Sequence, residues 1–126
     1  MLMNKRTGSV VADTVEIADT RATRKRGLLG RDGMAPHSAL MISPCCAVHT
    51  AFMRFAIDVA FVDRNGDVVR IVRDMGPWRI AAAWRGRRVI EMPAGELQRR
   101  GVRLGDRLYL ATAEGDECKA ARTLSA

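Results

Sequence analysis

Short runs of alternating apolar and polar residues recur along this chain, and they predict β-strands rather than long helices. Residues 9–17, 40–42, 79–84, 89–92 and 107–112 carry this pattern. Gly, Pro, Asn and Asp separate the runs at short intervals, as is typical of turns. The pattern predicts a mainly β fold. We expect a compact small barrel or sandwich of short, mostly antiparallel strands with one or two short helices.

The clearest local signal is the dipeptide Asn65-Gly66, which separates the apolar residues 57–63 from residues 68–73. Asn-Gly between two apolar runs is typical of a two-residue hairpin turn, because both central positions need a positive φ. We therefore expect the two runs to pair as antiparallel strands.

Two segments have helical character. Residues 20–31 predict a short helix that Thr20 can cap and that Gly30 or Gly33 can end. Its basic run, residues 24–26, predicts a solvent-exposed helix face. Residues 93–100 predict a second short helix or helical turn, which Gly101 ends.

Length and composition place the chain among ordinary globular proteins. A chain of 126 residues, 48% of them hydrophobic, is expected to form a single domain over residues 1–126. We expect an ordered core over residues 9–112 and a polar tail over 113–126. No apolar run approaches the ~20 residues that cross a bilayer, so no membrane span is expected. No signal-like segment opens the chain, and three cysteines without framework spacing fit a reducing compartment, so we expect a cytoplasmic protein.

The formal net charge is +7, which can indicate nucleic acid, a membrane surface or an anionic ligand as a partner. However, the arginines are spread along the sequence as singles and pairs rather than gathered on one predicted helix. The sequence therefore argues against a nucleic-acid partner and leaves the partner, a small ligand or a protein, unknown.

Four blocks occur in a characteristic order: R-G-L-L-G-R at residues 26–31, V-H-T-A-F-M-R-F-A-I-D-V-A-F-V-D-R-N-G-D-V-V at 48–69, V-I-E-M-P-A-G at 89–95 and G-D-R-L at 105–108. This order resembles the domain-of-unknown-function family 192, over roughly residues 9–112. The resemblance implies a small, mainly β domain of bacteria and archaea, with no established reaction. A frequent form of the family has aromatic-Met-Lys-Asn-Thr where this chain has F-M-R-F-A at residues 52–56. Any role of the missing Asn-Thr pair is therefore not carried over. Many members look exported or lipid-anchored, and this sequence departs from them in having no leader.

Residues 45–63 hold most of the candidate chemistry, and Asp58 stands out because it interrupts an apolar strand. A buried carboxylate needs a partner or several hydrogen bonds, since leaving it bare costs several kcal/mol. Arg54 and His49 are the nearest candidate partners, and Arg54 can also clamp an anion. In the functional interpretation Asp58 anchors a ligand or acts as a base. In the structural interpretation it binds backbone amides of the preceding loop.

Cys45 and His49 invite a metal or nucleophile interpretation. Residues four apart in a strand share a face but lie about 13 Å apart, too far to hold one ion. We therefore expect no metal and no cofactor, although a turn at Cys45 would bring the pair closer. Trp78 follows Gly-Pro in a loop and either lines a site or covers a barrel end, whereas Trp84 is expected in the core or at its edge.

Three function hypotheses remain open. The first is a non-enzymatic module that binds a small polar or anionic ligand, or a peptide segment, in a pocket near residues 45–58. Its ligand-binding residues are His49, Arg54, Asp58, Trp78 and Cys45. The second is a hydrolase or metal-assisted enzyme that uses His49 and Asp58. The third is a structural or docking domain without a ligand, which is favoured if His49, Arg54 and Asp58 point to different faces.

Overall fold

The computed structural model describes residues 1–112. The predicted polar tail, residues 113–126 with Cys118, lies outside the described residues. The elements are β1 (Leu2–Asn4), β2 (Val10–Ala12), β3 (Thr14–Ala18), α1 (Arg21–Arg26), β4 (Ser38–Ile42), β5 (Ala47–His49), β6 (Ile57–Val62), β7 (Val68–Met75), β8 (Ile80–Ala82), β9 (Arg88–Pro93), α2 (Glu96–Arg99) and β10 (Leu108–Leu110).

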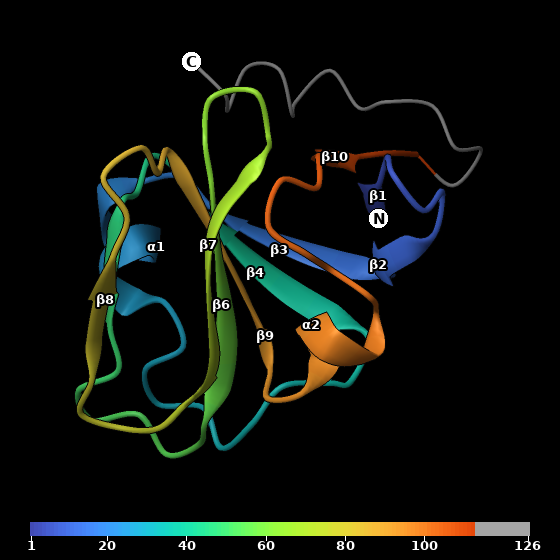
Figure 1. The fold of residues 1–126 in the computed structure, drawn as a ribbon. Helices are drawn as coiled ribbons and strands as arrows, with labels where there is room; N and C mark the ends of the chain where they lie inside the picture. Colours follow the sequence, from blue (N-terminus) through green and yellow to red (C-terminus); the bar gives the residue numbers. More distant parts are fainter. Residues whose placement is uncertain (113–126) are drawn as a thin grey trace.

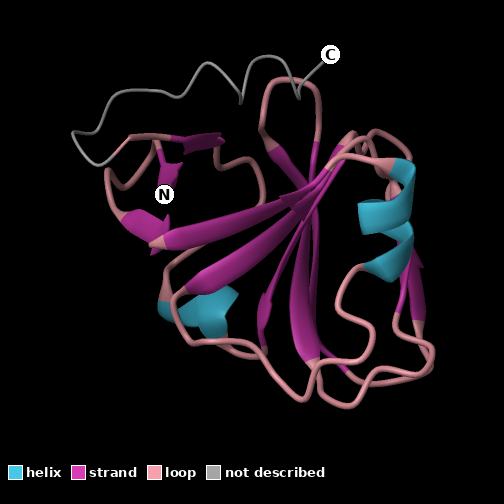
Figure 2. Cartoon of the chain, turned by 180° about the vertical axis from the view of Figure 1, so that it is seen from behind, coloured by secondary structure: helices cyan, strands magenta, loops and turns pink. Residues whose placement is uncertain are grey.

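A five-stranded sheet in the order β3-β4-β9-β6-β7 forms the middle layer. Strands β3 and β4 are parallel, and the other neighbours in this sheet are antiparallel. Figure 1 shows α1 and the β5–β8 ribbon on one side of this sheet, and α2 with the β10-β1-β2 sheet on the other. Figure 2 shows the same layers from behind. We call these two sides the α1 face and the α2 face.

The period-2 alternation of the central strands builds a separate hydrophobic cluster on each face. In β4, Leu40 and Ile42 join the cluster on the α1 face, whereas Ala39 and Met41 join the one on the α2 face. Strands β6 and β9 alternate in the same way. The mainly β class is confirmed. The layers are sandwich-like, and no sheet of residues 1–112 closes on itself, so the barrel alternative is wrong.

The predicted antiparallel pairing of β6 with β7 is confirmed, but the predicted two-residue turn is wrong. Of its two central residues only Gly66 has a positive φ, at 87°. The Asp63 carboxylate accepts the backbone N–H groups of Asn65 and Asp67 at 2.9 and 3.0 Å, which stabilises a longer turn. Asp63, two residues before Asn65, therefore favours a longer turn than the two-residue turn that Asn-Gly predicts.

The remaining boundaries differ from the predictions in ways that local contacts explain. Thr20 caps α1 as expected, but the helix ends at Gly27 (φ 47°) and not at Gly30 or Gly33. The predicted strand over 9–17 divides at Asp13, since β2 pairs with β1 while β3 pairs with β4. Strand β1 lies before the predicted core.

Candidate functional site

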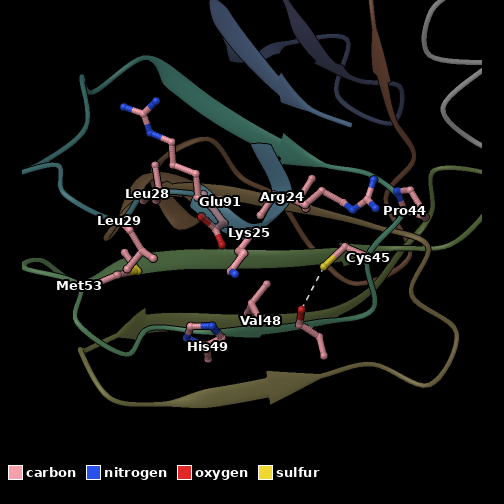
Figure 3. Close-up of a pocket in the computed structure, with 14 residues that line it drawn as sticks. Arg24, Lys25, Leu28, Leu29, Pro44, Cys45, Val48, His49, Met53 and Glu91 are labelled. Atoms are coloured by element: carbon pink, nitrogen blue, oxygen red, sulfur yellow. Dashed lines mark hydrogen bonds between the residues drawn. The ribbon is translucent and has the colours of Figure 1, made fainter. Parts of the chain in front are cut away.

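A pocket of about 290 Å³ opens on the α1 face, between α1 with its following loop, β5 and β9 (Figure 3). Its walls are mostly apolar, its mouth is basic, and one acid lies inside. The lining residues are Arg24, Lys25, Arg26, Gly27, Leu28, Leu29, Ile42, Pro44, Cys45, Ala47, Val48, His49, Met53 and Glu91.

Local sequence positions the basic mouth. The Thr20 hydroxyl accepts the backbone N–H of Thr23 at 3.1 Å and begins α1, and buried Leu28 anchors the loop that follows it. This arrangement brings residues 24–26 to the pocket, so the predicted purely solvent-exposed basic face is wrong for Arg24. Its side chain is half-buried, and its guanidinium donates to the Asp19 carbonyl at 2.8 Å.

Glu91 is the acid inside the pocket. It lies on β9 between Leu40 of β4 and Val59 of β6, at a position where the alternation of the strand calls for an apolar side chain. Glu91 is 4% exposed, and its Oε2 atom has no hydrogen-bond partner among residues 1–112. Figure 3 shows the carboxylate pointing into the pocket.

Burial raises the pKa of Glu91 from its ordinary value of 4.5 to about 7. The charge of Arg31 acts in the opposite direction but does not cancel the effect of burial. The guanidinium of Arg31 forks onto the Glu16 carboxylate, with N–O distances of 2.8 and 2.9 Å. Arg31 is therefore engaged by Glu16, and Glu91 is left without an ion-pair partner among the described residues.

Cys45 and His49, both predicted site residues, line this same pocket. The Cys45 thiol donates to the carbonyl of Ala47 at 3.0 Å, and burial raises its pKa. The hydrogen bond with Ala47 lowers the pKa of Cys45, but burial outweighs it and favours the thiol over the nucleophilic thiolate. His49 ends β5 with its side chain exposed, and no hydrogen bond joins it to Cys45 within residues 1–112.

Asp58 is fully buried, as expected, but it lies away from this pocket. It pairs across the sheet with Met92, a residue of the α2-face cluster. Its Oδ1 accepts the N–H of Asp74 at 2.9 Å, and its Oδ2 accepts those of Gly95 and Leu97 at 3.0 and 3.1 Å. Backbone amides thus satisfy Asp58, but they belong to β7 and α2 rather than to the loop before it.

Arg54 and Trp78 do not line the pocket either. The Arg54 guanidinium pairs with Asp32 at 2.8 Å on the surface, not with Asp58. Trp78 is 65% exposed and makes an edge contact with Phe52, with 4.5 Å between the ring centroids. Trp84 was expected in the core or at its edge, but it is 97% exposed, because β8 ends at Ala82 and the turn carries the side chain outward.

The predicted site therefore comes together only in part. Cys45 and His49 share one pocket, whereas Asp58 lies on the α2 face and cannot act with His49 there. Within residues 1–112, no group of three or more His, Cys, Asp or Glu side chains is placed to hold a metal ion. The divergence of His49, Arg54 and Asp58 argues against a site built on that trio and meets the condition that favours the structural or docking hypothesis, so a ligand site has to rest on other residues.

Glu91 is the residue that sequence reasoning missed. The run V-I-E-M-P at residues 89–93 places one acid inside an apolar strand, the same signal that drew attention to Asp58. The two acids differ in their partners, since three amides bind Asp58 while Glu91 Oε2 has none among the described residues. Only the folded structure distinguishes a satisfied buried acid from an unsatisfied one.

The fold and the pocket define a small sandwich-like β protein with one buried acid in a mostly apolar cavity that has a basic mouth. The chain belongs to the family DUF192 (Uncharacterized ACR, COG1430), which residues 2–110 match. It is 33% identical to a UPF0127 protein of Thermococcus sibiricus over 114 residues, which cover 86% of this chain and 73% of that protein. It is 31% identical to a UPF0127 protein of Pyrococcus furiosus over 113 residues, which cover 85% of this chain and 95% of that protein.

Two solved structures share the fold. A protein of unknown function from Novosphingobium aromaticivorans superimposes with a TM-score of 0.70 at 21% identity, covering 76% of this chain and 74% of that one. A proposed transcription regulator from Sinorhizobium meliloti superimposes with a TM-score of 0.69 at 27% identity, covering 75% of this chain and 78% of that one. In residues 1–112, neither helix has the length and apolar character that crossing a membrane requires.

Proposed function

We propose that this protein is a non-enzymatic module that binds a small polar ligand in the pocket between α1, β5 and β9. The observation that carries the proposal is the buried Glu91 Oε2 atom, which points into the pocket without a partner among residues 1–112. An unsatisfied buried carboxylate destabilises the fold by several kcal/mol. A hydrogen-bond donor on a ligand supplies the missing partner and recovers part of that free energy.

The charges around the pocket narrow the ligand class. Glu91 inside favours a donor, best of all an ammonium group, while Arg24 and Lys25 at the mouth favour an anionic group. A zwitterion of amino-acid size carries both groups, and about 290 Å³ lies near the lower end of ligand-pocket volumes. Cys45 and His49 line the same space and keep the contact role predicted from sequence.

The pH dependence of binding follows from the same carboxylate. An ammonium group binds the ionised form of Glu91, whose pKa is about 7. The ionised fraction rises about tenfold between pH 6 and pH 8, so the apparent Kd should fall about tenfold over that range. A ligand that contacts only the basic residues at the pocket mouth would show no such fall of the apparent Kd with pH.

Calorimetric titration with the free amino acids tests the proposal. The N-acetyl derivative of a binding amino acid removes the ammonium group, and its methyl ester removes the carboxylate. We expect each derivative to bind more weakly than the amino acid itself. The Glu91→Gln variant should bind the unmodified amino acid at least tenfold more weakly than the wild type does. Asp67→Asn is the control, since Asp67 is an acid paired with Arg107 and lies outside the pocket lining. Equal binding by the wild type and Glu91→Gln would contradict the proposal.

Native mass spectrometry of protein purified without chelator adds a second readout. A retained small molecule that Glu91→Gln loses supports the pocket as a ligand site. Clean masses for both proteins, together with no binding of any amino acid, would favour the docking alternative.

The enzyme alternative has less support, because the Cys45 thiol faces a carbonyl and His49 and Asp58 lie apart. The free thiols of Cys45 and Cys46 agree with the cytoplasmic location expected from sequence.

A further inference from the structure

A second surface with its own chemistry surrounds Trp84, and its lining residues are different from those of the Glu91 pocket. Trp84 follows β8 and is 97% exposed. Two hollows adjoin its side chain. One, of about 560 Å³, is lined by Asp63, Arg64, Trp84, Arg85 and Arg87. The other, of about 260 Å³, is lined by Val69, Arg70, Ala82, Ala83, Trp84 and Arg85. We call Trp84 with its four lining arginines the Trp84 surface.

The fold gathers these arginines from separate parts of the sequence. Arg64 lies in the β6–β7 turn and Arg70 in β7, whereas Arg85 and Arg87 lie between β8 and β9. The sequence argument against a nucleic-acid partner rested on scattered arginines. That argument does not hold at this place, because the hairpin and the β8–β9 turn bring the arginines together around one tryptophan.

The charge of this surface is largely uncompensated. Arg64, Arg85 and Arg87 make no salt bridge within the part of the chain that the structure describes. Asp63 is the acid in the lining of the larger hollow, and its Oδ1 is occupied by the turn amides of Asn65 and Asp67. The lining of the smaller hollow contains no acid. The surface therefore favours an anionic partner.

We infer that the Trp84 surface binds single-stranded nucleic acid, with the indole stacked on a base and the arginines on neighbouring phosphates. An exposed indole has a flat face that any base can stack on, and guanidinium groups contact phosphates with two parallel donors. A duplex hides its base faces from such a platform. A membrane surface calls for long apolar side chains around the tryptophan, but the aliphatic residues that line the smaller hollow are the short Val69, Ala82 and Ala83.

Fluorescence anisotropy with a labelled single-stranded oligodeoxythymidylate of about ten nucleotides tests this inference at low salt. Trp84→Ala is expected to weaken binding about tenfold. Trp78→Ala is the matched control, since Trp78 is the other exposed tryptophan and lies before β8 rather than after it. It should change binding less than about twofold. Because Trp84 is almost fully exposed, its removal should leave thermal unfolding unchanged.

The salt dependence of binding distinguishes direct contact between the arginines and phosphates from general attraction to a basic protein. Removing Arg85 and Arg87 together, as Arg85→Gln with Arg87→Gln, should make the dependence of log Kd on log salt shallower by about 1.4. Arg21→Gln with Arg103→Gln removes the same charge from exposed positions elsewhere, and should change that slope by less than half as much.

Four results would overturn the inference. One is the absence of binding at low salt, and another is equal binding by Trp84→Ala and Trp78→Ala. The third is binding of a duplex of the same length as tight as that of the single strand. Binding to phosphatidylglycerol vesicles but not to the oligonucleotide would also overturn it and assign the surface to a lipid partner. Glu91→Gln should bind the oligonucleotide normally, which keeps this test independent of the ligand pocket.

Discussion

Replacing Glu91 with glutamine should change how the stability of this protein depends on pH. Burial raises the pKa of Glu91 from 4.5 to about 7 in the folded protein. Between those values the folded protein holds a proton that the unfolded chain has released. Stability from this group is therefore complete below about pH 4.5 and is lost as pH rises through about 7.

The magnitude follows from the two pKa values. A rise from 4.5 to about 7 corresponds to about 3 kcal/mol in total, at 1.36 kcal/mol per pKa unit. Between about pH 5 and about pH 8, the wild type should lose about 2 to 3 kcal/mol of unfolding free energy through this carboxylate. Glutamine has nearly the same shape and does not titrate, so Glu91→Gln should lose none of it.

Urea unfolding at the two pH values, followed by far-ultraviolet circular dichroism, measures the effect. Both tryptophans are exposed in the fold, so their fluorescence is a poor probe of unfolding. Each protein is first unfolded and refolded to remove any retained ligand. The quantity compared is the stability difference between wild type and Glu91→Gln at each pH, since other groups titrate equally in both proteins.

Asp67→Asn serves as the control. The Arg107 guanidinium that binds the Asp67 carboxylate lowers the pKa of Asp67, so this group titrates below the tested range and the control should show no change. If the difference between wild type and Glu91→Gln stays within about 0.5 kcal/mol from pH 5 to pH 8, Glu91 is not an unsatisfied buried acid. That result would also remove the main support for the proposed ligand pocket.

Three further predictions concern the polar groups that hold the fold. Asp58→Asn should lower the unfolding free energy by about 3 kcal/mol, because an amide nitrogen would face backbone donors; urea unfolding measures it, and the exposed Asp13→Asn should cost under about 0.5 kcal/mol. The hydrogen bond from Arg6 holds the pKa of Asp106 at about 2. Stability should therefore fall by up to about 2 kcal/mol as pH drops from 4 to 2, and thermal unfolding of Asp106→Asn should lack this acid loss. The buried Thr50 hydroxyl donates to the Gly76 carbonyl at 2.6 Å and accepts the backbone N–H of Arg79 at 2.8 Å. Thr50→Val should cost about 2 kcal/mol in the same urea assay, and an unchanged midpoint would contradict this role.

The sequence predicted the β-rich fold well where local rules decide it. Alternation, turn residues and the cap at Thr20 act over a few residues, so the strand pairing around Asn65 and the start of α1 were predictable. The end of α1 was misjudged because residues 28 and 29 look helical but serve as anchors in a loop. Tertiary contact overrode local propensity there.

The candidate site was predictable only in part, for a different reason. Burial of Asp58 followed from its apolar neighbours, but the origin of its three donors depends on where β7 and α2 lie. The same kind of pattern surrounds Glu91, but its burial was not predicted. Its missing partner could not be predicted either, since that depends on Arg31 turning to Glu16 instead. The exposed position of Trp84 depends likewise on where β8 ends.

The three backbone N–H groups that bind Asp58, here called the amide clamp, also bear on how relatives of this protein should be compared. Asparagine would present a donor to the clamp and glutamate is longer by one carbon, so the position should tolerate few substitutions for reasons of folding alone. An aspartate that stays the same across relatives would then report the joining of β6, β7 and α2, and not a reaction. A search for active-site residues that ranks positions by invariance would go to the α2 face first. Variation at position 91 is the more informative signal, because under the proposed function it would follow changes in the ligand.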